Sequence, residues 1–284
     1  MEKVSIIIPC YNKEPYVKEA VKSALNQTYK NIEIICIDDC STDNSRAVLK
    51  ELAEKYDNIT LIEEDKNIGV CRARNKAIEI ASGEYILPLD ADDTIEPTYI
   101  EKAINVFDGN PNIGVVYSRV RNLKNRKEIL KGTNELNNLL HDNFITCSSV
   151  FKKSDFQKVG GYDTAFDKIG CEDWDLYLSF LEKGCNFYQI DEILFNYRQK
   201  TNKNRTAIQL KNRNAVYFSI LIKHKSLYNK AFGNKAFETF FDSLRLNKKY
   251  RKYKNLFNIF VAVAIFETAI IIAYFAYKFS GGIL

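Results

Sequence analysis

The sequence is poor in the residues that build transition-metal sites. Its 284 residues include only two His, and its seven Cys form no CxxC pair and no zinc-ligand spacing. Zinc ligands usually recur at short, characteristic spacings, so no dedicated transition-metal site is expected. An odd number of scattered Cys predicts reduced, mostly buried thiols in a cytosolic setting.

Several signatures of other protein classes are missing as well. No GxGxxG follows the first apolar run, which counts against a dinucleotide-binding fold, and the absence of GxxxxGK[ST] excludes a P-loop. The residues after Met1 are a Glu and a Lys, which predicts no secretory signal. The aromatic residues between 206 and 254 are interpreted as packing residues, so no nucleic-acid partner is expected.

The composition that remains is that of a folded protein with a distinct basic end. Hydrophobic residues make up 46% and aromatic residues 13% of the chain. This length can bury the core of one large α/β domain and still carry an appendage. Residues 1–200 carry 26 Lys and Arg against 33 Asp and Glu, whereas residues 201–284 carry 15 against 3. The basic segment is therefore expected to be a separate feature from the acidic domain.

Short apolar runs alternate with amphipathic segments along the first half of the chain. This alternation predicts an α/β fold with a mostly parallel sheet and right-handed crossovers. A cluster of N-cap residues at 41–43 is expected to open the second helix, and 119–138 is interpreted as a polar surface excursion. The predicted strands are 4–9, 32–37, 59–62, 85–89, 115–120, 145–151 and 187–194, and the predicted helices are 14–26, 41–56, 70–81, 97–107, 153–159 and 172–183.

Polar residues recur where the predicted strands end. Tyr11 and Asn12 follow the first strand, Asp38 and Asp39 the second, and the run 90–93 the fourth. Open α/β sheets bind ligands at the carboxyl ends of parallel strands. A base and ribose can bind along the first two ends, and Mg²⁺, held by carboxylates and substrate phosphates, at the third. The competing interpretations are an acidic turn for 90–93 and helix capping for the Asp38–Asp39 pair.

Two further groups of charged residues can carry chemistry. Arg72 and Arg74 lie early in the helix after Gly69, where an Arg can contact phosphate or ribose; the alternative is a solvated basic face. Glu172 and Asp173 open another helix, where acids also stabilise the helix dipole. A carboxylate there can act as the general base for an acceptor hydroxyl. His141 and His224 are interpreted as ordinary surface residues.

These segments together resemble glycosyltransferase family 2. The resemblance spans residues 3–200 in family order, and the motifs are specific as a set although each is weak alone. It implies a GT-A (Rossmann-like) fold and inverting transfer of a sugar from a nucleotide-sugar donor. The matching segments are 4–12, 37–43, 67–69, 73–75, 90–92 and 172–176.

The resemblance also implies roles for individual residues. Asp39 would face the base, usually uracil, so a UDP-sugar is the expected donor. Asp90-Ala91-Asp92 matches the DXD motif, with Asp92 as ligand of Mg²⁺ or Mn²⁺ and Asp90 supporting ribose or metal. Asp173 matches the catalytic base, with Glu172 assisting it. The residues expected to bind the donor are Pro9, Tyr11, Asn12, Asp39, Asn67, Arg74, Asp90 and Ala91.

The sequence departs from the family in ways that narrow the class. No QxxRW-like motif follows 172–173, which argues against a processive polysaccharide synthase, and Lys200 and Asn202 stand where many members have a His. The acceptor is expected to be a glycan or lipid-linked hydroxyl in cell-surface polysaccharide synthesis. The alternatives are a sugar nucleotidyltransferase, against which the lack of a GxGxR-like loop argues, and a non-catalytic GT-A scaffold protein.

The carboxyl-terminal segment predicts association with a membrane. Residues 256–277 are apolar except for three positions, and as a helix they would extend about 33 Å, enough to cross a bilayer. A basic cluster at 245–254 precedes them and favours anionic lipid on the cytoplasmic face. The segment is expected to span the membrane, to lie on it, or to form homo-oligomers. The predicted division is a catalytic domain at 1–200, a basic helical extension at 201–255 and a hydrophobic helix at 256–278.

Overall fold

The computed structural model describes residues 2–130, 136–198 and 213–233. The chain divides into two compact units, Met1–Leu227 and Tyr228–Leu284, and the fold described below is that of the first. This unit extends past residue 200 and includes helix α8 (Arg213–Lys223). Helix α9 (Lys225–Phe232) crosses the boundary between the units.

The first unit is organised around one nine-stranded sheet. The order across it is β3-β2-β1-β4-β8-β6-β9-β5, and β7 pairs with β6 outside this path. Strands β1, β2, β3 and β4 are mutually parallel, and β6 and β9 are parallel to each other, whereas β8, β5 and β7 pair antiparallel with their neighbours. The predicted mostly parallel α/β sheet is therefore confirmed. The strands are β1 (Val4–Cys10), β2 (Ile32–Asp38), β3 (Ile59–Glu63), β4 (Tyr85–Pro88), β5 (Thr94–Ile95), β6 (Ile113–Asn122), β7 (Glu128–Leu130), β8 (Val150–Lys152) and β9 (Asn186–Tyr197).

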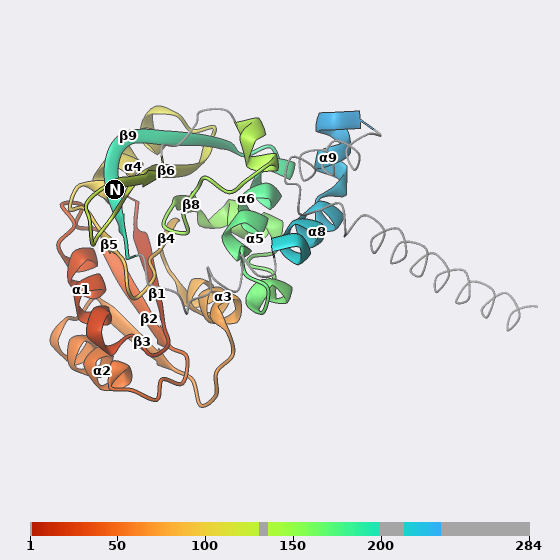
Figure 1. Cartoon of the computed structure of the whole chain (residues 1–284). Helices are drawn as coiled ribbons and strands as arrows, with labels where there is room; N and C mark the ends of the chain where they lie inside the picture. The colour runs from red at the N-terminus through yellow and green to blue at the C-terminus, as the bar shows by residue number, and fades with distance from the viewer. Residues whose placement is uncertain (1, 131–135, 199–212, 234–284) are drawn as a thin grey trace, which may run out of the picture. The chain divides into compact units, whose positions relative to one another are not determined.

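Helices cover both faces of the parallel strands (Figure 1). Every residue of β1 is buried, as expected of a strand with helices on both sides. The alternate residues Val4, Ile6 and Ile8 share one core cluster with α1 (Glu14–Leu25), α2 (Ser45–Lys55) and α4 (Tyr99–Gly109). Helix α3 (Val70–Ile80) packs against β1 and β2 from the opposite face. The other helices described in this unit are η1 (Leu136–Leu140), α5 (Lys153–Val159), η2 (Thr164–Asp167) and α6 (Glu172–Glu182).

The strand register brings three loops to one edge of the sheet. Cys10 at the end of β1 lies opposite Asp38 at the end of β2. The N–H of Leu89, just after β4, donates to the carbonyl of Ile7 in β1 over 2.9 Å. The polar residues that follow these three strands therefore meet at the same edge, as predicted from their positions in the sequence.

The interpretation of 119–138 as a surface excursion was wrong for residues 119–122, whereas residues 124–127 are exposed as expected. Residues 119–122 continue β6, and a turn leads into β7. Arg119 donates to Glu128 of β7, and Arg121 donates to Asn196 of β9. Arg119 and Arg121, which were interpreted as loop residues, thus form hydrogen bonds with residues of neighbouring strands.

Two boundaries also differ from prediction. The strand expected at 145–151 begins only at Val150, and the helix expected from 41 begins at Ser45. Asp43 accepts a bond from the N–H of Ser45 over 2.9 Å and another from the N–H of Glu14 over 3.1 Å. The capping cluster therefore serves the start of α1 as well as that of α2.

His224 was wrongly interpreted as a surface residue. It is fully buried at the end of α8, with Nε2 3.0 Å from Asp175 of α6 and Nδ1 3.2 Å from Glu182. Lys223 donates to the other oxygen of Asp175 over 2.8 Å. These contacts attach α8 to α6. No local pattern in the sequence predicts them, because the partners are far apart along the chain.

The predicted membrane segment at 256–277 and the basic cluster at 245–254 lie outside the described residues. Of the predicted basic extension at 201–255, only residues 213–233 are described. Among the helices that are described, none combines the length and the apolar character that crossing a bilayer requires.

Candidate active site

A cleft of about 400 Å³ opens where the three strand ends meet. This volume lies within the range of small-molecule sites. Seven of the predicted donor and metal residues line it, namely Pro9, Tyr11, Asp39, Asn67, Asp90, Ala91 and Asp92. The other lining residues are Cys10, Lys13, Gly69, Val70, Ala73, Asp167, Tyr197 and Arg198. Asn12, Arg74, Glu172 and Asp173 do not line the cleft itself.

The loop after β1 presents Tyr11 and is braced by Asn12. The Tyr11 side chain is 45% exposed, which leaves its ring accessible to a planar ligand. Asn12 has a left-handed backbone (φ 53°), and its side-chain oxygen accepts a bond from the N–H of Thr42 over 2.8 Å. Asn12 therefore holds the β1 loop to the β2 loop.

Asp39 fixes the loop that precedes α3. Its two carboxylate oxygens accept bonds from the N–H groups of Ile68, over 2.6 Å, and Gly69, over 3.0 Å. Asn67 donates to the backbone carbonyl of Asp39 over 3.1 Å. Burial raises the pKa of Asp39 despite these bonds. Asp39 is also one of the residues that line the cleft.

The run from Asp90 to Asp93 holds three carboxylates in different surroundings. Asp92 accepts a bond from Nζ of Lys13 over 2.8 Å. Asp93 is 1% exposed; Oδ1 accepts from the N–H of Arg198 over 2.7 Å, while Oδ2 has no hydrogen-bond partner in the described part of the chain. Burial, followed by the charges of Asp90 and Asp92, raises the pKa of Asp93 well above its ordinary value. Asp93 was missed as a site residue, although its place in the acidic run was a usable signal.

These residues fit a divalent cation. Carboxylate oxygens are the ligands that Mg²⁺ takes in proteins, and Asp90 and Asp92 both line the cleft. The buried, unpartnered Oδ2 of Asp93 is a further carboxyl oxygen close to Asp90. Because Lys13 neutralises Asp92 here, a cation at Asp92 would take the place of its ammonium group.

Arg74 connects the cleft to the helix that carries the predicted base. Its guanidinium is buried and donates to Asp90 over 2.6 Å and to Glu172 over 2.9 Å. The ring of Tyr162 lies 5.2 Å from its centre. The alternative interpretation, that both arginines lie on a solvated basic face, is therefore wrong for Arg74. Arg72 is exposed, as that interpretation expects. Arg74 is turned toward carboxylates and does not line the cleft, so it orients Asp90 and Glu172.

Glu172 and Asp173 form the first turn of α6. Two residues with left-handed backbones, Gly170 (φ 80°) and Cys171 (φ 65°), turn the chain sharply into the helix. Burial and, next, the neighbouring charge of Glu172 raise the pKa of Asp173 to about 7, against smaller lowering effects of the Trp174 N–H and Arg74. A carboxylate in this range can take up a proton at neutral pH.

Four other residues at the cleft had no sequence signal: Lys13, Asp167, Tyr197 and Arg198. Asp167 is distant in sequence from α3, yet its Oδ1 accepts the N–H of Cys71 over 2.7 Å. A Cβ on Gly69, whose φ is +91°, would lie 2.7 Å from the Asp167 carboxyl carbon. The glycine is needed both for its backbone angle and for this close approach.

The sequence is similar to those of known glycosyltransferases. Residues 5–166 match the family described as Glycosyl transferase family 2, and residues 137–202 match the N-terminal domain of galactosyltransferase. An uncharacterized glycosyltransferase of Methanocaldococcus jannaschii is 30% identical over 85% of this chain and 86% of its own length. The minor teichoic acid biosynthesis protein GgaB of Bacillus subtilis is 32% identical over 76% of this chain, which spans only 25% of that protein.

Solved structures of other proteins have a fold similar to that of this chain. Residues 1–349 of S. aureus TarS in complex with UDP-GlcNAc superimpose with a TM-score of 0.70 and 17% identity, covering 84% of this chain and 71% of that one. The mannosyltransferase PcManGT of Pyrobaculum calidifontis, in complex with GDP-Man and Mn²⁺, gives a TM-score of 0.57 and 18% identity, covering 93% and 86%. At these identities the likeness concerns the fold alone.

Proposed function

This chain belongs to glycosyl transferase family 2, and we propose that it is an inverting enzyme that moves a sugar from a UDP-sugar to an acceptor hydroxyl. Its GT-A fold is that of the TarS structures, and it is a glycosyltransferase. The observation that carries the proposal is the buried Arg74, which bonds Asp90 at the cleft and Glu172 beside Asp173. One ion-pair network thus links a nucleotide-sized cleft to a carboxylate with a pKa near neutrality. The family match leaves the nucleotidyltransferase and scaffold alternatives without support.

The donor would lie along the carboxyl ends of β1, β2 and β4. Tyr11 offers an exposed ring for the base, and Asp39 and Asn67 line the same cleft. Lys13 and Arg198 supply positive charge near the position of a diphosphate. UDP-GlcNAc in TarS and GDP-Man in PcManGT support a nucleotide-sugar donor as a class.

A divalent cation would be held by Asp92 and Asp90. When bound, Mg²⁺ or Mn²⁺ would neutralise the charge that develops on the leaving diphosphate. The Mn²⁺ in the PcManGT complex supports this assignment.

Asp173 would act as the general base. Its carboxylate takes the proton of the acceptor hydroxyl while that oxygen forms a bond to the anomeric carbon of the sugar. The bond between this carbon and the diphosphate oxygen breaks, and the nucleoside diphosphate leaves with the electron pair. A single displacement of this kind inverts the anomeric configuration. Arg74 keeps Glu172 and Asp90 in place around the reacting groups.

The setting proposed for this reaction is cell-surface polysaccharide synthesis at the cytoplasmic face of the membrane. The likeness to GgaB, a teichoic acid biosynthesis protein, supports a place in cell-surface glycan synthesis, and the acceptor proposed is a glycan or lipid-linked hydroxyl. The division into a catalytic domain, a basic extension and a hydrophobic helix stays a prediction, as do the membrane surface and the homo-oligomer.

Calorimetric titration with UDP, with and without Mn²⁺, tests the donor site. We expect UDP to bind more tightly than GDP or CDP and to lose most of its affinity in EDTA. Asp92→Asn should abolish the effect of Mn²⁺, since a direct ligand should contribute at least the roughly 10–100-fold seen for outer partners.

Asp57→Asn, on an exposed residue between α2 and β3, is the matched control and should bind UDP with Mn²⁺ as the unaltered protein does. Equal UDP affinity in EDTA and Mn²⁺, together with no change in Asp92→Asn, would contradict the metal assignment. If no nucleoside diphosphate binds, the donor site itself is misassigned.

The pH dependence of transfer tests the general base. Only ionised Asp173 can accept a proton, so kcat/KM should fall by about tenfold per pH unit below its apparent pKa. That pKa should lie at about 7. Glu172→Gln removes a neighbouring negative charge and should move the acid limb to lower pH. A rate that does not change across neutral pH in the unaltered enzyme would contradict this role.

A further inference from the structure

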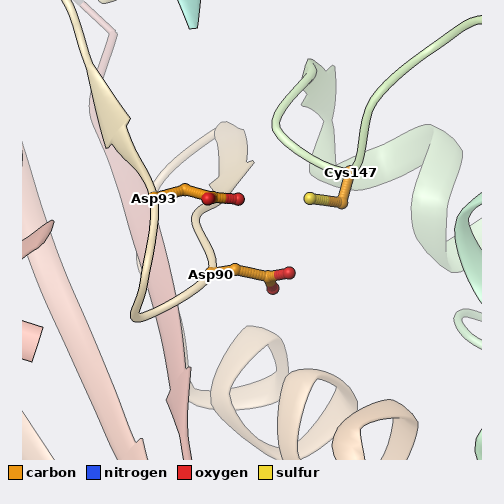
Figure 2. A group of neighbouring side chains, drawn as sticks. All are labelled: Asp90, Asp93 and Cys147. Atoms are coloured by element: carbon orange, nitrogen blue, oxygen red, sulfur yellow. The ribbon is translucent and has the colours of Figure 1, made fainter. Parts of the chain in front are cut away.

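A thiol lies beside the two carboxylates at the end of β4. Asp90, Asp93 and Cys147 each offer one ligand atom, and these atoms all lie within 4.8 Å of one another. Figure 2 shows Asp93, from the β4–β5 segment, and Cys147, from the segment before β8, pointing toward each other, with the Asp90 carboxylate below the space between them, so the three ligand atoms surround a common centre. The donor set is therefore two carboxylate oxygens and one sulfur.

The unpartnered oxygen of Asp93 is independent evidence for a ligand at this centre. Asp93 is 1% exposed, and its Oδ2 is buried with no hydrogen-bond partner within the described ranges. A buried carboxylate oxygen left unsatisfied is costly, and such groups are usually paired or coordinate a metal. Oδ1 is already used by the N–H of Arg198, so Oδ2 is the atom available to a ligand.

The sulfur determines which cation fits. Mg²⁺ and Mn²⁺ prefer oxygen ligands, whereas a thiolate selects softer ions such as Zn²⁺. Zn²⁺ binds sulfur at about 2.3 Å and carboxylate oxygen at about 2.0–2.2 Å, which places its ligand atoms roughly 3.5 Å apart. The three ligand atoms now lie within 4.8 Å of one another, so a bound ion would have to draw them closer by up to about 1.3 Å. A fourth coordination position would then stay open.

We propose that Asp90, Asp93 and Cys147 form a binding site for a thiophilic divalent cation such as Zn²⁺, distinct from the Asp92 site that the donor's cation would use. Binding deprotonates the thiol and releases its proton to solvent. Asp90 belongs to both sites, so Zn²⁺ at this site would draw Asp90 away from Arg74 and from the donor. The last consequence rests on the proposed function, whereas Zn²⁺ binding itself does not.

Zn²⁺ titration of the full chain without nucleotide tests the site directly. The unaltered protein should bind Zn²⁺ at least about tenfold more tightly than Cys147→Ser, because even outer partners of a metal contribute about 10–100-fold. Co²⁺ gives a second readout: a sulfur-to-cobalt charge-transfer band should appear in the unaltered protein and be absent in Cys147→Ser. Mg²⁺ affinity should be the same in both proteins.

The matched control is Cys185→Ser, because Cys185 is another partly buried free thiol outside the cluster. It should keep the Zn²⁺ affinity and the Co²⁺ band of the unaltered protein. Equal Zn²⁺ binding by Cys147→Ser and the unaltered protein, or an equal loss in Cys185→Ser, would overturn the proposal. Failure of the Zn²⁺-free protein to bind UDP, with Zn²⁺ binding intact, would instead contradict the donor site alone.

Discussion

Asp173→Asn is expected to lower kcat by about 10²–10⁴-fold, the usual contribution of a general base, while UDP still binds. The amide keeps an oxygen where Asp173 Oδ1 accepts the N–H of Trp174 over 2.9 Å, so the start of α6 should be preserved. What is lost is the group that takes the acceptor's proton. The measurement is sugar transfer from a UDP-sugar, alongside UDP affinity from calorimetry.

A suitable control for this substitution is Asp191→Asn. Asp191 lies in β9, and its side chain is 91% exposed, in a surface pair with Arg119. The same chemical change there should leave kcat and UDP affinity unaltered, because exposed pairs contribute little. If Asp173→Asn retains full transfer, the base must be sought elsewhere, and the role assigned to α6 is wrong.

Arg74→Met is expected to cost about 3–5 kcal/mol of unfolding free energy, the usual effect of breaking a buried ion pair by removing one partner. Arg74 is 1% exposed and lies between Asp90 and Glu172. Met fills much of the space but supplies no charge, so both carboxylates lose their shared cation. Transfer should be lost as well, because the same cation orients groups on both sides of the site.

Urea unfolding of Arg74→Met and of Arg72→Met measures this effect. Arg72 lies on the same helix and is exposed, and in the part of the chain that the structure describes it donates to the carbonyl of Ile68 over 3.3 Å. Its replacement should change stability little. Similar unfolding free energies for the two variants would mean that the buried pairs add nothing to stability. Full transfer by folded Arg74→Met would remove the link between the two halves of the site.

The parallel half of the fold could be read from the sequence for a physical reason. Strands buried on both faces leave continuous apolar runs, and Ile6, Ile7 and Ile8 are all fully buried. The helices between them have clear amphipathic periodicity. The clustering of Asp39, Asp90 and Asp92 then follows, since the ends of parallel strands share one edge.

The other half depends on partners that are far away in the sequence. Arg119 and Arg121 resembled loop residues because their partners lie on other strands. Arg74 and Glu172 are separated by 98 positions, and Cys71 and Asp167 by 96. The spacing of possible metal ligands in the sequence also does not identify Cys147, because it lies close to Asp90 and Asp93 only in the folded chain. Long-range pairs of this kind leave no local pattern to read.

The ion pair between Lys13 and Asp92 has a consequence for the order in which ligands bind. Free Mn²⁺ entering the cleft must separate a pair whose atoms are 2.8 Å apart, and it gains only part of its ligands in return. A diphosphate changes this balance, because it gives the displaced ammonium a new anion and supplies the cation with more oxygens. Metal and nucleotide should therefore bind with positive cooperativity, and by reciprocity each raises the affinity of the other by the same factor. Lys13 thus acts as the counterion of Asp92, which discriminates against a cation that arrives without a nucleotide.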